Sequence, residues 1–220
     1  MKKISSFNQL LTLFFIFIFL LISFRIIYSG TLRYVFMGWN IFLAWIPYIL
    51  SGYFEQYKRK EKWKQFFLFG SWLIFFPNAL YIVTDLVHLQ SESNMPWWYD
   101  VLLVFASSFI GIVLAFISLR KAEFYLQSVF SKQAVTACIA GILFLGSFGV
   151  YLGRFQRWNS WDVLNNPIAL GMDIFSKIIN PVDNYKVWAI TILFTAVFSM
   201  LYFFIKILPQ AIAEIKNTGH

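Results

Sequence analysis

The stretch that decides the fold is Phe75-Phe-Pro-Asn-Ala-Leu-Tyr-Ile-Val-Thr-Asp-Leu-Val-His-Leu89. It is mostly apolar, but it carries Asn78, Tyr81, Asp85 and His88 at spacings of three, four and three. On an α-helix these four positions fall within about 80° of one another. Lipid cannot satisfy such a polar stripe, so in a membrane helix it must face protein or water. The stretch therefore predicts a membrane helix that carries a candidate polar site.

The composition places the whole chain in the class of all-α polytopic membrane proteins. Of its 220 residues, 60% are hydrophobic and only 13% are charged, about half the charge of a soluble domain. The net charge is +8, and half of it lies in the run of residues 58–64, which fits contact with anionic lipid better than binding of nucleic acid. Cys138 is the only cysteine, which excludes an internal disulfide and a cysteine-based metal site. We expect a single integral membrane domain, residues 1–220.

Six apolar segments have about the 20 residues that a transmembrane helix needs. They cover residues 8–28, 34–53, 66–88, 98–119, 133–153 and 186–208. No small-residue cleavage site follows the first segment, so we interpret it as an uncleaved span. The distribution of Lys and Arg over the loops predicts that both termini lie in the cytoplasm. The expected location is therefore the plasma membrane, with the lipid bilayer as the surrounding partner.

A shorter amphipathic helix is expected between the fifth and sixth spans. After Pro167, apolar residues recur at helical spacing over residues 168–179. This pattern is typical of a helix that lies in the outer membrane interface. A packed extracellular loop helix is the alternative.

Polar side chains from four of the spans are expected at one depth near the outer face. All five aspartates also fall on the outer side, although acidic residues contribute little to topology. The candidate site residues are Asn40, Asn78, Tyr81, Asp85, His88, Asp100, Arg154, Arg157, Asn159 and Asp162.

Three of these residues are candidates for catalysis, namely Asp85, His88 and Asp100. His88 could act as a general base that a carboxylate orients, or Asp85 could be the base. The same three side chains could bind a divalent metal such as Mg²⁺, Mn²⁺ or Zn²⁺. The third and fourth spans are joined by a short connection and should be antiparallel neighbours. We therefore expect His88 to hydrogen-bond an aspartate of another span, with Asp100 as the first choice.

The remaining candidates suit substrate binding. Arg154 and Arg157 offer the bidentate fork that binds phosphate, at the height of a lipid headgroup. Asn40, Asn78, Tyr81, Asn159 and Asp162 would supply further polar contacts. The alternative is that these groups pair with one another and lock the bundle, because buried charges are usually paired.

Small residues recur along one face of the fourth span. Ser107, Gly111, Ala115 and Ser118 lie on or near this face. A stripe of small residues permits close approach of a neighbouring helix. We therefore expect this stripe to be a helix-packing seam.

Four motifs give the chain a family resemblance. They are Trp39-Asn40 with Trp45-Ile-Pro47, then Phe76-Pro-Asn-Ala-Leu-Tyr-Ile-Val-Thr-Asp-Leu-Val-His88, then Trp98-Tyr-Asp100, then Gly153-Arg-Phe-Gln-Arg-Trp-Asn-Ser-Trp-Asp162. In this order, over about residues 30–205, the chain resembles the domain-of-unknown-function 1361 family of bacterial multi-pass membrane proteins. The resemblance implies the fold and the choice of motifs, and it implies no activity, ligand or cofactor.

Two functional hypotheses result. The first is a membrane protein of the cell envelope whose outward-facing polar site binds or processes a phosphorylated lipid-linked substrate. The second is a non-enzymatic assembly or transport accessory whose polar motifs only hold the helices together.

Overall fold

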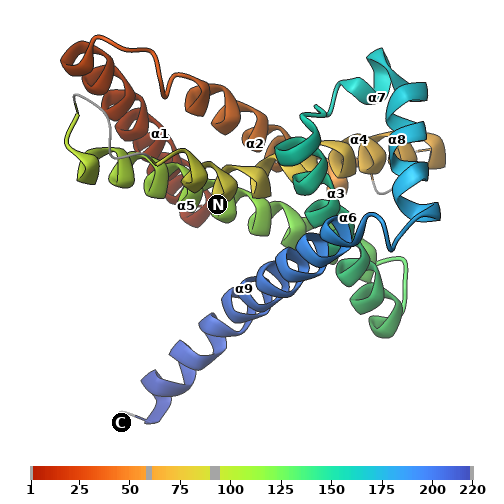
Figure 1. The fold of residues 1–220 in the computed structure, drawn as a ribbon. Coiled ribbons are helices and arrows are strands. Elements are labelled where there is room, and N and C mark those ends of the chain that lie inside the picture. Colours follow the sequence, from red (N-terminus) through yellow and green to blue (C-terminus); the bar gives the residue numbers. More distant parts are fainter. Residues whose placement is uncertain (1, 58–60, 90–94, 219–220) are drawn as a thin grey trace. The chain divides into compact units, whose positions relative to one another are not determined.

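The computed structural model describes residues 2–57, 61–89 and 95–218, and every regular element among them is a helix (Figure 1). The predicted all-α class is thus confirmed. The chain forms two compact units, Met1–Ala122 and Glu123–His220, with the boundary inside one long helix. The expectation of a single domain stays a prediction. Of the expected basic run 58–64, residues 58–60 lie outside the described part of the chain.

Five of the described helices are long and apolar enough to cross a bilayer. They lie in α1 (Lys2–Ser29), in α4 (Lys62–Tyr81) continued by η1 (Ile82–His88), in α5 (Trp97–Gln127), in α6 (Lys132–Gln156) and in α9 (Tyr185–Thr218). The remaining expected span, 34–53, corresponds to α2 (Phe36–Gly52), which has 17 residues. At about 25 Å it stands at the lower limit for a span. The orientation with both termini inside stays a prediction.

In unit 1, helix α2 packs along α4, and α4 packs against α5. Phe54 in the short helix α3 (Phe54–Tyr57) lies edge-on to Trp72 of α4, with 5.7 Å between ring centroids. The Trp72 indole donates a hydrogen bond to Ser118 Oγ in α5 at 3.1 Å. A Cβ added at Gly111 would lie 2.9 Å from the carbonyl oxygen of Ala79. The predicted seam of small residues on α5 is therefore confirmed as the surface that α4 approaches.

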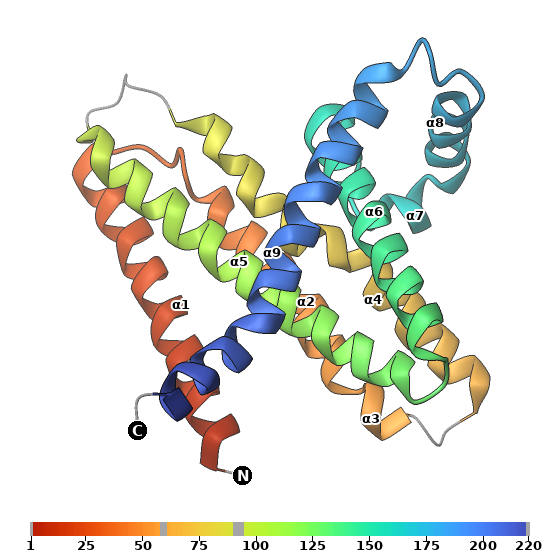
Figure 2. The same cartoon turned by 90° about the horizontal axis from the view of Figure 1, so that it is seen from below.

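In unit 2, helix α6 packs along α9 (Figures 1 and 2). The core at their connected ends consists of Tyr151 and Leu152 from α6 and Val187 from α9. The connection holds the short helix α7 (Asp162–Asn165) and the longer helix α8 (Pro167–Ile179). Leu170 and Ile174 of α8 pack against this core. Helix α8 is thus held at the end of the α6–α9 pair.

The expected amphipathic helix over 168–179 is confirmed as a helix, α8. The side of α8 that faces the unit carries Leu170 and Ile174 together with Lys177, which is only 4% exposed and pairs with the Asp173 carboxylate. Its apolar side faces outward, with Ile168 75%, Met172 64% and Phe175 63% exposed. A contiguous exposed apolar face is typical of a surface that contacts lipid or a partner. This orientation supports the predicted position in the membrane interface.

Candidate functional site

Residues 75–89 do not form one continuous α-helix. Helix α4 ends at Tyr81, and the chain then winds more tightly as the 3₁₀-helix η1 to His88. Pro77, which has no backbone N–H, lies one turn before this change. The Ile82 carbonyl at the junction accepts a hydrogen bond from Ser108 Oγ of α5 at 3.1 Å. The predicted α-helical stripe is therefore wrong beyond Tyr81, because a 3₁₀-helix has three residues per turn.

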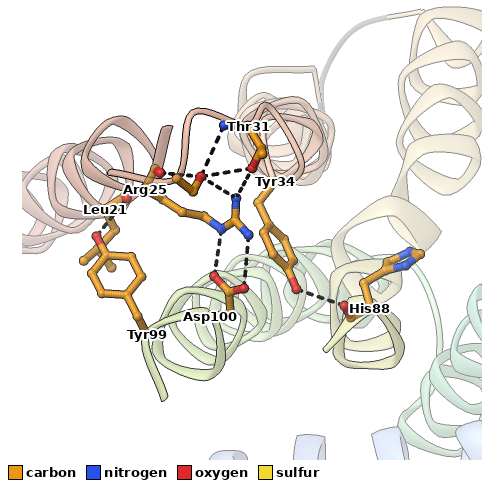
Figure 3. Close-up of polar contacts among 8 residues, drawn as sticks. Leu21, Arg25, Thr31, Tyr34, His88, Tyr99 and Asp100 are labelled. Carbon is orange, nitrogen blue, oxygen red and sulfur yellow. Dashed lines mark hydrogen bonds and ion pairs between the residues drawn. The ribbon is translucent and has the colours of Figure 1, made fainter. Parts of the chain in front are cut away.

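A buried ion pair is the centre of the polar cluster in unit 1. Arg25 Nε donates to one oxygen of Asp100 at 2.7 Å, and Arg25 Nη2 donates to the other at 3.1 Å. The two side chains are each 1% exposed. Arg25 comes from α1 and Asp100 from the first turn of α5, so the pair links two helices (Figure 3). Both oxygens of Asp100 are thus used within the protein.

The Arg25 guanidinium has further contacts on its other sides (Figure 3). Its Nη1 donates to Thr31 Oγ1 at 3.1 Å and to Ser29 Oγ at 3.5 Å. The guanidinium carbon lies 4.4 Å from the centre of the Tyr34 ring, within the range of a cation–π contact. The end of α1 and the turn before α2 therefore enclose this cation almost completely.

Tyr34 connects this cluster to the end of η1. Its buried phenol donates a hydrogen bond to the His88 carbonyl oxygen at 2.9 Å. Burial raises the pKa of the Tyr34 phenol, and the negative charge of Asp100 raises it further, while Arg33 and Arg25 act in the opposite direction. Tyr34 is therefore a neutral hydrogen-bond donor at physiological pH.

A second polar contact links α2 to η1. Asn40 Nδ2 of α2 donates to Asp85 Oδ2 at 2.8 Å. Asp85 is 1% exposed, and Asn40 is half-buried. Two residues with different expected roles, Asp85 in catalysis and Asn40 in substrate binding, are thus hydrogen-bonded to each other.

The expected hydrogen bond between His88 and Asp100 is wrong. Asp100 binds Arg25 with both oxygens, and the exposed His88 imidazole points away from that carboxylate (Figure 3). The His88 ring lies edge-on to Phe36, with 5.4 Å between ring centroids. The physical reason is that a permanent cation from α1 offers Asp100 a stronger, bidentate partner than a histidine.

The expected metal site is also not assembled. In the part of the chain that the structure describes, no group of three His, Cys, Asp or Glu side chains could hold an ion. Asp100 is turned toward Arg25, and Asp85 accepts from Asn40. The set of Asp85, His88 and Asp100 therefore does not form the predicted three-ligand centre.

Asn78 and Tyr81 lie half-buried near the end of α4, in the same unit as Asp85. The Tyr81 carbonyl accepts a hydrogen bond from Thr84 Oγ1 at 2.6 Å. Their predicted role in substrate binding stays a prediction.

The candidate binding residues at the end of the fifth span lie in unit 2. Their predicted convergence with the polar cluster of unit 1 stays a prediction. These residues are Arg154, Arg157, Asn159 and Asp162. Asp162 Oδ2 accepts from the Asn159 backbone N–H at 2.7 Å, which holds the turn before α7. Arg154 is half-buried in the last turn of α6. Arg157 ends α6 in the left-handed conformation, with φ of 61°. Its side chain is exposed, and among the described residues it has no ion pair or hydrogen bond.

Two partly buried ion pairs in unit 2 were not predicted from the sequence. Asp173 pairs with Lys177 and accepts from the Trp158 indole at 2.9 Å. Glu123, near the C-terminal end of α5, accepts hydrogen bonds from Tyr202 and Lys206 of α9.

Arg25 was also missed, and a signal for it was present. It is a cation within the apolar span Ser6–Ser29. An ionisable residue inside a span is itself an indication of a buried partner.

Comparison with known proteins gives one match. The model of a family described as proteins of unknown function (DUF1361) matches residues 39–201, about three quarters of the chain. This range includes Asn40, Asp85 and Asp100 but begins after Arg25 and Tyr34. No curated protein and no solved structure matches the chain.

Proposed function

Because the chain belongs to the domain-of-unknown-function 1361 family, which carries no assigned activity, we propose a function from the geometry of its motif residues. The protein is a non-enzymatic accessory of the plasma membrane, and its polar motifs in unit 1 hold the outer ends of its helices together. The observation that carries this proposal is the Arg25–Asp100 pair, in which both carboxylate oxygens accept from one guanidinium at 1% exposure.

The accessibility of the two carboxylates supports this role over catalysis. A general base must lie within hydrogen-bond reach of the proton that it removes from a substrate. Asp85 and Asp100 are each 1% exposed, and each accepts hydrogen bonds from another helix. His88 is exposed but points away from Asp100. The three expected catalytic groups thus do not face one common space.

The test is to replace the ion pair with apolar residues of similar size. We expect Asp100→Leu alone to lower both the stability in detergent and the ability to complement a deletion strain. The double variant Arg25→Met/Asp100→Leu should recover both, because an apolar pair can replace a buried ion pair without loss of stability. If the double variant regains stability but does not complement, Asp100 acts in a site and the proposed function is wrong.

A second candidate function, binding of a phosphorylated lipid, is favoured by Arg157. This exposed cation follows the last turn of α6 and adopts a backbone conformation that costs a non-glycine residue about 1–2 kcal/mol. Strained conformations of this kind cluster at binding and catalytic sites. The guanidinium offers a lipid phosphate two parallel hydrogen bonds.

Arg157→Gly separates a binding role from a packing role. Glycine adopts the left-handed conformation freely, so this variant should be as stable as the wild type or more stable. A binding role predicts that the variant loses retention of phosphatidic acid in lipid mass spectrometry of the purified protein, with Arg157→Lys retaining part of it. Equal retention in all three proteins would exclude this candidate.

A further inference from the structure

An apolar groove runs between α1 and α2 in unit 1. It has a volume of about 250 Å³ and is lined mainly by Phe15, Ile18 and Ile22 of α1 and by Gly38, Ile41 and Trp45 of α2. The lining covers eight residues of each helix, 15–22 and 38–45, and the seven rises between the first and last residue give a length of about 10 Å. Ile18, Ile22 and Ile41 are buried and form its floor. The groove is smaller than the ~300–1,000 Å³ typical of drug-sized ligand sites.

The groove is closed at both ends by contacts between its walls. At the inner end, the rings of Phe15 and Trp45 meet edge-on, with centroids 6.1 Å apart. At the outer end, one turn beyond Ile22, the Arg25 guanidinium lies over the Tyr34 ring at 4.4 Å. The two walls therefore touch above and below the groove and separate between these contacts. This shape provides a bounded site along the helix surface.

Gly38 is the first residue of α2 that lines the groove, and it leaves this part of the groove open. A Cβ added at this position would meet no atom within 4 Å. The neighbouring Phe42 and Trp45 of α2 and Phe19 of α1 are exposed around the opening. Since the span Ser6–Ser29 forms one wall, the medium at this depth is the hydrocarbon of the bilayer.

We propose that this groove binds one acyl chain of a membrane phospholipid. Its lining is apolar, its volume suits a single hydrocarbon chain, and its bounded ends distinguish it from the open lipid-facing surface of the same helices. The acyl chain fills the space between α1 and α2 that no side chain of the described residues fills. This inference goes beyond the role of the polar motifs and does not depend on it.

The test uses the full chain and a phosphatidylcholine that carries a diazirine in its acyl chain, mixed into vesicles of phosphatidylethanolamine and phosphatidylglycerol. The protein is extracted in detergent, washed to remove loosely held lipid, irradiated and mapped by peptide mass spectrometry. We expect label within residues 15–22 and 38–45 to survive washing. Label at Met200, which is 72% exposed on α9, should be lost, because that position faces only exchangeable lipid.

Gly38→Phe should abolish the wash-resistant label, because a side chain that starts in open space at this Cβ position places its ring in the groove. Gly141→Phe is the matched control, since Gly141 is an exposed helical glycine that also has open space around its Cβ position. It should label like the wild type, and both variants should melt at the wild-type temperature.

Two results would overturn the proposal. One is that, in the wild-type protein, washing removes the label in the groove to the same extent as the label at Met200. This result would show that the groove holds only exchangeable lipid. The other is unchanged wash-resistant label in a folded Gly38→Phe variant. If Gly38→Phe does not fold, the wild-type comparison decides alone, because it needs no substitution.

Discussion

Replacing Arg25 with Met while Asp100 is retained should lower the free energy of unfolding by about 3–5 kcal/mol, because it leaves a buried charge without its partner. The Asp100 side chain is 1% exposed, and both of its hydrogen bonds come from Arg25. The variant therefore removes every hydrogen bond that the structure gives this carboxylate.

The opposite variant, Asp100→Leu, should be less damaging. The Arg25 guanidinium keeps its hydrogen bonds to Ser29 and Thr31 and its contact with the Tyr34 ring. Each retained hydrogen bond contributes about 0.5–1.5 kcal/mol, so we expect a loss about 1–2 kcal/mol smaller than for Arg25→Met. The double variant Arg25→Met/Asp100→Leu should return to within about 1 kcal/mol of the wild type.

Unfolding of the four proteins in mixed detergent micelles, followed by tryptophan fluorescence, measures these differences. The exposed pair of Glu61 and Lys64, with side chains 62% and 38% exposed, provides the control. Lys64→Met should change stability by at most about 0.5 kcal/mol, because surface ion pairs contribute little. The expectation is wrong if Arg25→Met lowers the free energy of unfolding no more than Lys64→Met does. It is also wrong if the effects of Arg25→Met and Asp100→Leu are additive in the double variant.

Gly111→Val should destabilise the protein by about 1–3 kcal/mol through overpacking, because even a Cβ would lie 2.9 Å from the Ala79 carbonyl oxygen. The same unfolding assay in detergent measures this loss. Gly70→Val is the control, because a Cβ at Gly70 has open space. Tyr34→Phe should cost about 1 kcal/mol by removing the hydrogen bond to His88. The pKa of the Tyr34 phenol is raised in the folded state. The stability that the phenol contributes is therefore complete below about pH 10 and falls as the pH rises through its folded-state pKa. At alkaline pH the free energy of unfolding should thus fall less for Tyr34→Phe than for the wild type. A spin label at Phe175 of α8, which is 63% exposed, tests whether α8 lies in the bilayer interface. If it does, the label should be more accessible to oxygen than to a water-soluble nickel reagent. Greater accessibility to the nickel reagent would show that α8 does not lie in the interface.

The sequence by itself determined the class of the protein and the position of its helices. Apolar runs near the length of a bilayer crossing predicted the all-α architecture, because lipid leaves backbone groups no partner outside a helix or a closed barrel. Helical periodicity located α8, and the small residues around Gly111 located the seam between α4 and α5. These properties depend on residues close together in the chain.

The partners of the polar residues were decided only by the tertiary structure. Asp100 binds Arg25, 75 residues earlier, and the inward direction of Lys177 reverses what its charge alone would suggest. The change from α4 to η1 likewise depends on how α5 packs at Ser108 and Gly111. Such pairings follow from the depth and rotation of helices that are remote in sequence, and no local pattern specifies either quantity.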